Sequence, residues 1–212
     1  MTYKKERGMG MELKIPENFF VGAAMSGPQT EGAYKTGGRL ESIWDTWSDL
    51  SISDFYNKVG SYVGNNFYEK YEDDIKLLKS LHMDSLRTSM QWSRLLTKDG
   101  KLNQEGAQFY HKVCKCAKEN QIELFMNLYH FDMPTYLFER GGWESRDVVE
   151  AYAAYARAAF REFGSEIRYW FTFNEPIVEP DQRYRNGFWY PFIKDAKRGM
   201  QVQYHLSLAH SL

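Results

Sequence analysis

Residues 168–176 read RYWFTFNEP, a short run of aromatic and strand-forming side chains that ends abruptly at Asn174, Glu175 and Pro176. A largely apolar run of this length is typical of a strand that is covered on both faces, as in a parallel sheet. A carboxylate is seldom fully buried without a partner. Glu175 therefore marks either the point where the strand reaches water or the group that the strand presents.

Three earlier runs have the same character: FFVGAAM (19–25), DSLRTSM (84–90) and ELFMNLY (123–129). Longer segments follow them in which apolar residues recur at three- and four-residue steps, which predicts amphipathic helices. The predicted helices cover EKYEDDIKLLKSLHM (69–83, with Tyr71, Ile75, Leu78 and His82 on one stripe), the stretch after Asn103, the stretch from Ser145 to Gly164, and 196–212.

Four β-α repeats predict parallel strands joined by right-handed crossovers. At about 50 residues per repeat, eight repeats would form a large (β/α)8 barrel. We therefore expect an α/β fold in which residues 1–212 are a single partial domain, the N-terminal half of a TIM barrel with about four βα units. A doubly wound open sheet is the competing architecture, but no G-x-G-x-x-G turn follows the first run.

Charge and composition exclude several classes of partner. The 27 basic and 28 acidic residues give a net charge of −1, which offers no electrostatic reason to expect nucleic acid or an anionic membrane. No segment approaches the roughly 18 apolar residues of a membrane span. Residues 1–16 are charged and lack the apolar core of a secretory signal. Cys114 and Cys116 point apart on a predicted helix, so we expect free thiols, no metal site and a cytoplasmic location.

Polar side chains fall where each predicted strand ends, which is where the active sites of such barrels lie. They are Gln29 and Glu31 after the first run, Arg87 within the second, His130 directly after the third, and Asn174 and Glu175 at the end of the fourth. Each has a structural explanation by itself, such as a strand end in water, a core histidine, or a turn. Their joint occurrence favours a site, and a guanidinium inside an apolar strand also needs an anionic partner.

A carboxylic acid, amide and imidazole groups, and aromatic rings together suit the binding of a sugar. Amides and imidazoles hydrogen-bond hydroxyl groups, and the C–H face of a pyranose packs on an indole. Aromatic residues make up 17% of the chain and include six Trp, although Trp44, Trp47, Trp92 and Trp143 taken singly are more often core residues. Cleaving a glycosidic bond needs an acid for the leaving oxygen and a second carboxylate across the ring.

Several motifs resemble, in order and spacing, the N-terminal half of glycoside hydrolase family 1. They are FFVGAAMSGPQTEGAY (19–34), LRTSMQWSRL (86–95), NLYHFDMP (127–134) with GGW (141–143), and WFTFNEP (170–176). The resemblance runs from Leu13 to the end of the chain. That family contains β-glucosidases, β-galactosidases and 6-phospho-β-glycosidases.

The resemblance implies retaining hydrolysis of a β-glycoside without a metal or an organic cofactor. Carried over by motif, Glu175 corresponds to the general acid/base, and Asn174 to a ligand of the 2-hydroxyl group. Gln29 and His130 correspond to ligands of the glycone hydroxyls.

Two further residues enter through the same resemblance. Arg87 would pair with the nucleophilic glutamate, which would explain a charge inside the second strand. Trp143, in the GGW segment, would lie near the mouth of the site. Glu69 stands where relatives usually carry His, and the first run lacks a Trp that many relatives have after its first Phe. Both departures weaken an assignment to a subfamily but do not affect the expected reaction type.

The nucleophile of the family lies in a T-E-N-G-like motif that does not occur in these 212 residues. We therefore expect a fragment of a longer enzyme, or a chain that pairs with the remaining half of the barrel, and no hydrolysis by this chain alone. The expected substrates are β-glucosides or their 6-phosphates, and the lack of a secretory signal favours the phosphorylated class. The alternatives are a catalytically silent carbohydrate-binding half-barrel and an open-sheet enzyme that binds NAD or ATP.

Overall fold

The computed structural model of the chain describes residues 14–212. Residues 1–13, which carry most of the expectation about a secretory signal, lie outside the described residues. Within residues 14–212, no helix has the length and apolar character needed to cross a membrane.

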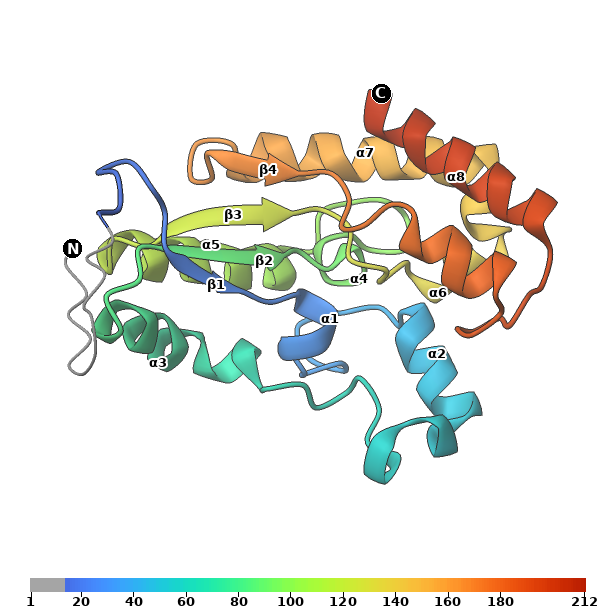
Figure 1. Ribbon diagram of the computed structural model, residues 1–212, viewed down its shortest axis with the longest axis horizontal. Helices are drawn as coiled ribbons and strands as arrows, with labels where there is room; N and C mark the ends of the chain where they lie inside the picture. Colours follow the sequence, from blue (N-terminus) through green and yellow to red (C-terminus); the bar gives the residue numbers. More distant parts are fainter. Residues whose placement is uncertain (1–13) are drawn as a thin grey trace.

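The four strands form one parallel sheet in the order β1 (Gly22–Ala24), β2 (Ser85–Ser89), β3 (Glu123–Asn127), β4 (Tyr169–Phe171). In Figure 1 all four run in the same direction through the centre of the molecule. The strand order never reverses, whereas a doubly wound sheet reverses at its switch point. The predicted fold class, half of a (β/α)8 barrel, is confirmed.

The helices are divided between the outer layer and the carboxyl ends of the strands. Their bounds are α1 (Gly27–Thr30), α2 (Ile43–Leu50), α3 (Phe67–Ser80), α4 (Trp92–Leu95), α5 (Gln104–Glu119), α6 (Thr135–Glu139), α7 (Arg146–Phe163) and α8 (Ala196–Ser211). Shorter turns are the 3-10 segments η1 (Ile52–Asp54), η2 (Tyr56–Lys58) and η3 (Gly142–Glu144) and the π-helical segment η4 (Pro180–Arg185). Figure 1 shows α1, α2 and α6 beyond the strand tips.

The four predicted helices correspond to α3, α5, α7 and α8, and one detail of the first was wrong. Helix α3 ends at Ser80, and His82 lies outside it, exposed and in a left-handed backbone conformation (φ 59°). The N–H of His82 donates to the carbonyl of Lys79, so the chain turns sharply there to enter β2. His82 is a turn residue and not part of the buried stripe.

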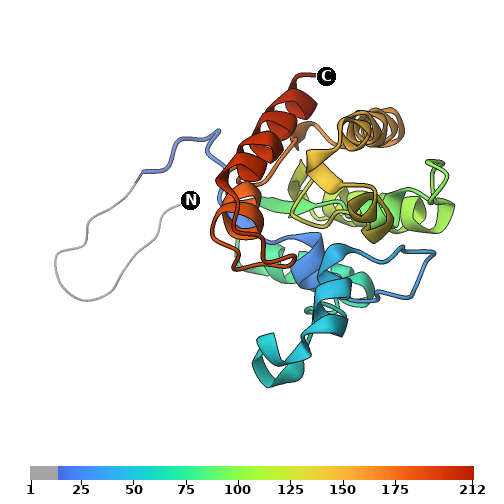
Figure 2. The ribbon, with the colours of Figure 1, turned by 90° about the vertical axis from the view of Figure 1, so that its right-hand side faces the viewer.

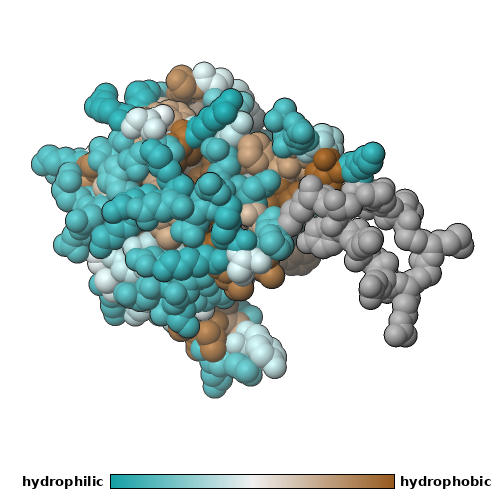
Figure 3. Space-filling model, turned by 90° about the vertical axis from the view of Figure 1, so that its left-hand side faces the viewer, coloured by the Kyte–Doolittle hydropathy of each residue, from teal (hydrophilic) through white to brown (hydrophobic). Residues whose placement is uncertain are grey.

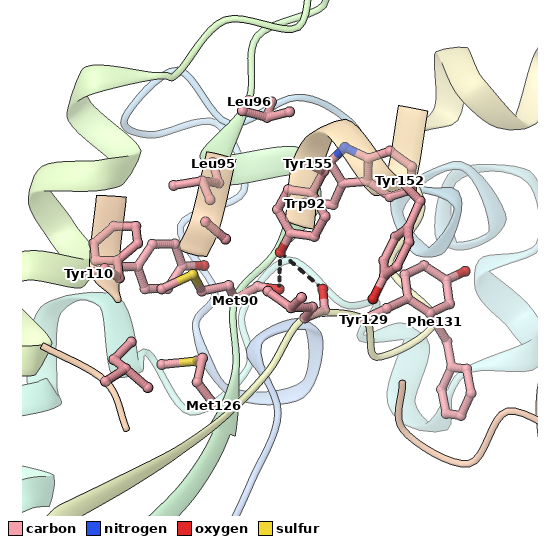
Figure 4. Packing of buried hydrophobic residues seen from close by; sticks show 14 of the residues in the cluster. Met90, Trp92, Leu95, Leu96, Tyr110, Met126, Tyr129, Phe131, Tyr152 and Tyr155 are labelled. Atoms are coloured by element: carbon pink, nitrogen blue, oxygen red, sulfur yellow. Dashed lines mark hydrogen bonds between the residues drawn. The ribbon is translucent and has the colours of Figure 1, made fainter. Parts of the chain in front are cut away.

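Helices α5 and α7 pack side by side against one face of the sheet (Figure 2). The stripes of both helices are buried, and Tyr155 of α7 reaches the strand tips. Its hydroxyl lies 3.2 Å from the carbonyl oxygen of Met90 and 2.9 Å from that of Leu128 (Figure 4). The Trp92 ring stacks on the Tyr155 ring with centroids 5.2 Å apart. This packing fixes the ends of β2 and β3, from which the site is built.

The other face of the sheet is less covered. Phe125 stacks on Tyr169 with ring centroids 4.6 Å apart, and Phe20 meets both rings edge-on. Phe171 on the same face remains 42% exposed. Within residues 14–212, β1 and β4 are each paired along one edge only. Figure 3 shows the end of the molecule near the amino ends of the strands, which is largely hydrophilic with apolar patches.

Cys114 and Cys116 are free thiols, as predicted, and both are buried on α5. Burial raises the pKa of the Cys114 thiol to about 12. A thiol reacts as the thiolate, so Cys114 has little nucleophilic character.

Candidate active site

A pocket of about 450 Å³ lies at the carboxyl ends of the strands. Its polar lining comes from three different strand-end loops, with Gln29 after β1, His130 after β3 and Glu175 after β4. Four aromatic side chains also line the wall, namely Trp44, Phe55, Phe131 and Trp189. Polar groups converging in a cleft with aromatic walls are the usual composition of a small-molecule site.

A larger hollow of about 680 Å³ lies at the opposite end of the sheet, beside Phe20, Cys114 and Glu123. Size alone would favour it. Active sites of (β/α)8 barrels lie at the carboxyl ends of the strands, however, whereas the amino ends contribute to the stability of the barrel. We therefore take the smaller pocket as the candidate site.

Glu175 is exposed and has a left-handed backbone conformation, with φ at 42°. Such a conformation costs a residue other than glycine about 1–3 kcal/mol and persists only where the surroundings enforce it. The N–H of Asn174 donates to the carbonyl of Tyr129 at 2.9 Å, and the carbonyl of Glu175 accepts from Val178 at 2.9 Å. The backbone on both sides is thus held, and the carboxylate lines the pocket.

Arg87 and Asn174 connect neighbouring parts of this rim. A terminal nitrogen of Arg87 donates to Oδ1 of Asn174 at 2.6 Å, and the guanidinium lies 5.6 Å from the centre of the Phe171 ring. With its oxygen directed to Arg87, the Asn174 side chain turns Nδ2 toward Glu175, 3.3 Å from Oε2. The structure gives Arg87 an amide oxygen as partner, and its pairing with a nucleophile stays a prediction.

His130 is half-buried and neutral at physiological pH. Burial, followed by the charge of Arg87, lowers the pKa of its imidazole to about 4. A neutral imidazole has one N–H donor and one acceptor nitrogen, which suits a hydroxyl group. The backbone N–H of His130 donates to Oδ1 of Asp132 at 3.0 Å, so the buried Asp132 carboxylate fixes the turn that carries His130.

Gln29 lies exposed on the short helix α1. Its side-chain oxygen accepts from the Ser26 hydroxyl at 2.6 Å, which leaves the amide N–H groups as donors for a ligand. Gly27 brings this loop against the end of β2, because a Cβ there would lie 2.7 Å from the Gln91 side chain. Only glycine permits that approach.

The sequence profile of glycosyl hydrolase family 1 matches residues 11–212. The chain belongs to this family. The result confirms the resemblance seen in the motifs, over nearly the same residues.

Two curated relatives illustrate the family match. The chain is 41% identical over 199 residues to 6-phospho-beta-glucosidase GmuD of Bacillus subtilis, covering 93% of this chain and 43% of that protein. It is 36% identical over 200 residues to beta-glucosidase A of Acetivibrio thermocellus, covering 94% and 44%. The chain therefore spans less than half the length of these relatives.

Solved structures of the family superpose closely. The family 1 β-glucosidase from Exiguobacterium antarcticum matches with a TM-score of 0.88 at 34% identity, over 93% of this chain and 44% of that one. The β-glucosidase from Thermotoga maritima in complex with cyclophellitol matches with a TM-score of 0.89 at 31% identity, over 93% and 45%. The glycosidase half-barrel fold is shared across these proteins.

Four of the residues singled out in this family 1 chain do not line the pocket. Arg87 and Asn174 lie beside it, joined to Glu175 by the hydrogen bonds described above. Trp143 and Glu31 lie in the protein interior. Trp143 is 1% exposed, and its indole N–H donates to the Tyr129 hydroxyl at 3.0 Å, so the structure places it in the core and not at the site mouth. Glu31 is buried as well and accepts from Arg94 at 2.6 Å and from Gln91 at 2.7 Å. Both side chains have their polar groups satisfied by neighbours inside the protein.

Sequence reasoning missed Asp132 and most of the aromatic wall. Asp132 is fully buried, and its carboxylate accepts from the backbone N–H groups of His130 and Trp92, joining the loops after β3 and β2. Burial raises the pKa of Asp132 to about 7, although those backbone donors oppose the shift. The available signal was its place two residues after a strand-end His, where Asp often bonds nearby backbone. No local pattern links Trp44 to Trp189.

Proposed function

We propose that the chain provides the acid/base side of the active site of a retaining β-glycosidase that acts on β-glucosides or their 6-phosphates. The observation that carries the proposal is the pocket shared by Glu175, Gln29 and His130 beneath aromatic walls. Its support from relatives is that the two described above are named as a 6-phospho-β-glucosidase and a β-glucosidase.

In this proposal Glu175 gives its proton to the leaving glycosidic oxygen and later takes one from water. Asn174 donates from Nδ2 to the 2-hydroxyl group, because Arg87 already occupies its oxygen at 2.6 Å. That hydrogen bond strengthens as positive charge develops on the sugar ring.

Gln29 and His130 bind hydroxyls of the same sugar. Both are neutral, so they can fix its orientation without adding charge beside Glu175. With a pKa of about 4, His130 keeps one donor and one acceptor across the neutral pH range. We expect sugar binding to be insensitive to the titration of this residue above pH 5.

Retaining hydrolysis needs a second carboxylate about 5–5.5 Å from the acid. Among the lining residues of the described chain, Glu175 is the one carboxylate. We propose that strands completing the barrel along the open edges of β1 and β4 supply the nucleophile, with Arg87 as its partner. These strands would belong to the parent chain or to a complementary one.

The test assays the completed barrel, either as the parent chain or as this chain together with a complementary one. The substrates are nitrophenyl β-glucosides and β-galactosides, each with and without a 6-phosphate. Turnover of a glucoside or its 6-phosphate supports the proposal, and the phosphate arm decides the subclass. Sugar binding without any turnover would instead support the catalytically silent half-barrel. Hydrolysis by the 212-residue chain alone would contradict the need for a second carboxylate from elsewhere.

Glu175→Gln tests the acid directly. We expect turnover of a phenyl glucoside to fall roughly 10²–10⁴-fold, because a poor leaving group depends on proton donation. A dinitrophenyl glucoside should lose much less in its first step, and sugar binding should persist. Glu119→Gln, an exposed change on α5, is the matched control and should leave all three readings unchanged.

A further inference from the structure

Arg183 in η4 is a completely buried cation that lies against the pocket wall from behind. Its guanidinium carbon is 5.4 Å from the ring centre of Trp44 and 5.4 Å from that of Trp189. The two indoles meet edge-on with centroids 5.1 Å apart, and both line the pocket. Cation–π contacts are strongest where water is excluded, as it is here.

The same guanidinium also holds backbone on two sides of the pocket. It donates to the carbonyl of Phe131 at 3.3 Å and to the carbonyl of Tyr190. Phe131 follows His130 directly, and Tyr190 follows Trp189. One side chain thus touches the loop after β3, helix α2 and the 186–195 loop.

Glu179 is the counter-ion. Its Oε1 lies 3.2 Å from Nε of Arg183, and its Oε2 accepts from the Tyr129 hydroxyl at 2.6 Å. Both Glu179 and Arg183 are nearly inaccessible to water, so removing either one would leave an uncompensated buried charge.

The position of Trp44 depends on packing, because its indole N–H is buried without a hydrogen-bond partner in the described part of the chain. Trp47, by contrast, donates to Asp54. The Trp44 ring packs against the hydrophobic core, stacks on Trp47 at 5.3 Å, and meets the edge of Trp189 and the cation. Taking away the cation therefore removes the one charged contact that holds this ring among these.

We infer that Arg183, neutralised by Glu179, is a positioning residue that holds Trp44, Trp189 and the His130 turn in one arrangement as the sugar-facing wall of the pocket. The inference rests on the proposed function for the identity of the ligand. It assigns to η4 a purpose that its sequence, PDQRYR, does not reveal. π-Helical turns occur frequently beside functional sites, which fits this assignment.

The test is ¹⁹F NMR of the chain labelled with 5-fluorotryptophan, assigned through Trp44→Phe and Trp189→Phe. In Arg183→Lys the charge remains, but an ammonium group cannot stack on two indoles and donate to two carbonyls in a fixed fork. We expect the Trp44 and Trp189 signals to shift or broaden and the Trp170 signal, from β4, to stay. Unchanged Trp44 and Trp189 signals, or an equal change at Trp170, would overturn the inference.

Arg185→Lys is the matched control. Arg185 lies on the same segment and pairs with Asp181, but it donates to Gln203 on α8 at 2.6 Å and faces away from the pocket. The Trp44 and Trp189 signals should be unaffected. If Arg183→Lys does not fold, Glu179→Gln with Arg183→Met replaces the pair without leaving a buried charge, and the same signals are read.

A ligand measurement separates this inference from the proposed function. Calorimetry with phenyl 1-thio-β-D-glucoside, which resists hydrolysis, should show binding to the wild-type chain and roughly tenfold weaker binding to Arg183→Lys. Equal affinities would contradict a positioning role in ligand binding. Absence of binding to the wild type argues against the proposed sugar site, and the fluorine signals then decide the role of Arg183.

Discussion

Two buried networks of the same composition lie beneath the strand tips, and they support different things. Glu31 and Arg94 form one, and Glu179 and Arg183 form the other, with N–O distances of 2.6 Å and 3.2 Å. A tyrosine hydroxyl donates to each glutamate, from Tyr110 at 2.8 Å in the first network and from Tyr129 at 2.6 Å in the second.

The difference lies in what each arginine touches. Arg94 donates to the carbonyls of Gly32, Ala33 and Thr36, and stacks over Tyr68, so it fixes the backbone of the loop after β1. Arg183 lies against two indoles of the pocket wall. The first network therefore supports the scaffold, and the second supports the site.

The largest expected effect is the loss of the scaffold network. Glu31→Ala leaves Arg94 buried without a counter-ion, and we expect the free energy of unfolding to fall by about 3–5 kcal/mol. Urea denaturation measures it. Glu72→Ala, which breaks the exposed Glu72–Lys76 pair, is the control and should cost at most about 1 kcal/mol. Equal losses for the two variants would show that Glu31 is not a scaffold element.

The second prediction compares the two tyrosines. Tyr110→Phe leaves the N–H of Gln91 unpaired, and Tyr129→Phe leaves the indole N–H of Trp143 unpaired, so each should cost roughly 1–3 kcal/mol of unfolding free energy. Tyr129→Phe should cost more, because Glu31 keeps close hydrogen bonds from Arg94 and Gln91 while Glu179 keeps only its ion pair. Urea denaturation of both variants decides, and a larger loss for Tyr110→Phe would reverse the ranking.

The repeating strand-helix pattern could be predicted from sequence because apolar runs and amphipathic stripes are local signals. The strands are shorter than the runs: the run 168–174 contributes only β4, Tyr169–Phe171, to the sheet. Beyond Phe171 the chain bends to present Glu175, and apolar residues there pack in the core without sheet pairing. Phe173, for example, stacks on Tyr152 with centroids 4.6 Å apart. Apolarity reports burial and does not report pairing.

The polar half of the candidate site could be predicted because parallel strands bring their carboxyl ends to one edge. The aromatic half could not be, since Trp44 and Trp189 meet through tertiary packing around Arg183. The burial of Glu31 could have been predicted from Arg94, because Arg94 is a charge of opposite sign in the motif QWSR after the next strand and pairs with Glu31. Trp143 was placed by resemblance alone, and a motif position does not tell which way a ring points.

Asp132 joins the two networks, since it accepts from Trp92, beside Gln91, and from His130, beside Tyr129. Its pKa of about 7 in the folded chain lies above the usual value near 4, because burial penalises the charged form. The folded state thus holds a proton that the unfolded state has released, so the stability contributed by this group falls as pH rises from about 4 to 7.

Asp132→Asn should remove that dependence. The difference in unfolding free energy between wild type and variant should shrink as pH rises through this window, by at most about 1.4 kcal/mol per pH unit for one proton. Urea titrations at several pH values measure the difference. A difference that stays constant with pH would mean that Asp132, which links the two networks, is ionised throughout this pH range.

The smallest expected effect tests whether the outer layer matters to the scaffold network. His111, next to Tyr110 on α5, lies 3.0 Å from Glu162 and 2.6 Å from Glu166 of the segment formed by α7 and its C-terminal turn. Burial lowers the pKa of His111, but the bonds to the two glutamates outweigh burial and the net shift is upward. Its stabilising contribution is therefore complete below about pH 6.5 and is lost as pH rises through the higher folded pKa.

His111→Gln should cost less than about 1 kcal/mol at pH 6, because the cluster is partly exposed, and close to nothing at pH 9. Urea unfolding at the two pH values checks this. In Tyr110→Phe the same substitution should have the same small effect, since His111 clamps two helices while Tyr110 bonds Glu31 from the other side of α5. If the effects of His111→Gln and Tyr110→Phe were strongly non-additive, the contacts of His111 with Glu162 and Glu166 would also set the geometry of the scaffold network. The scaffold network would then include the outer helices, which the network around Arg183 does not.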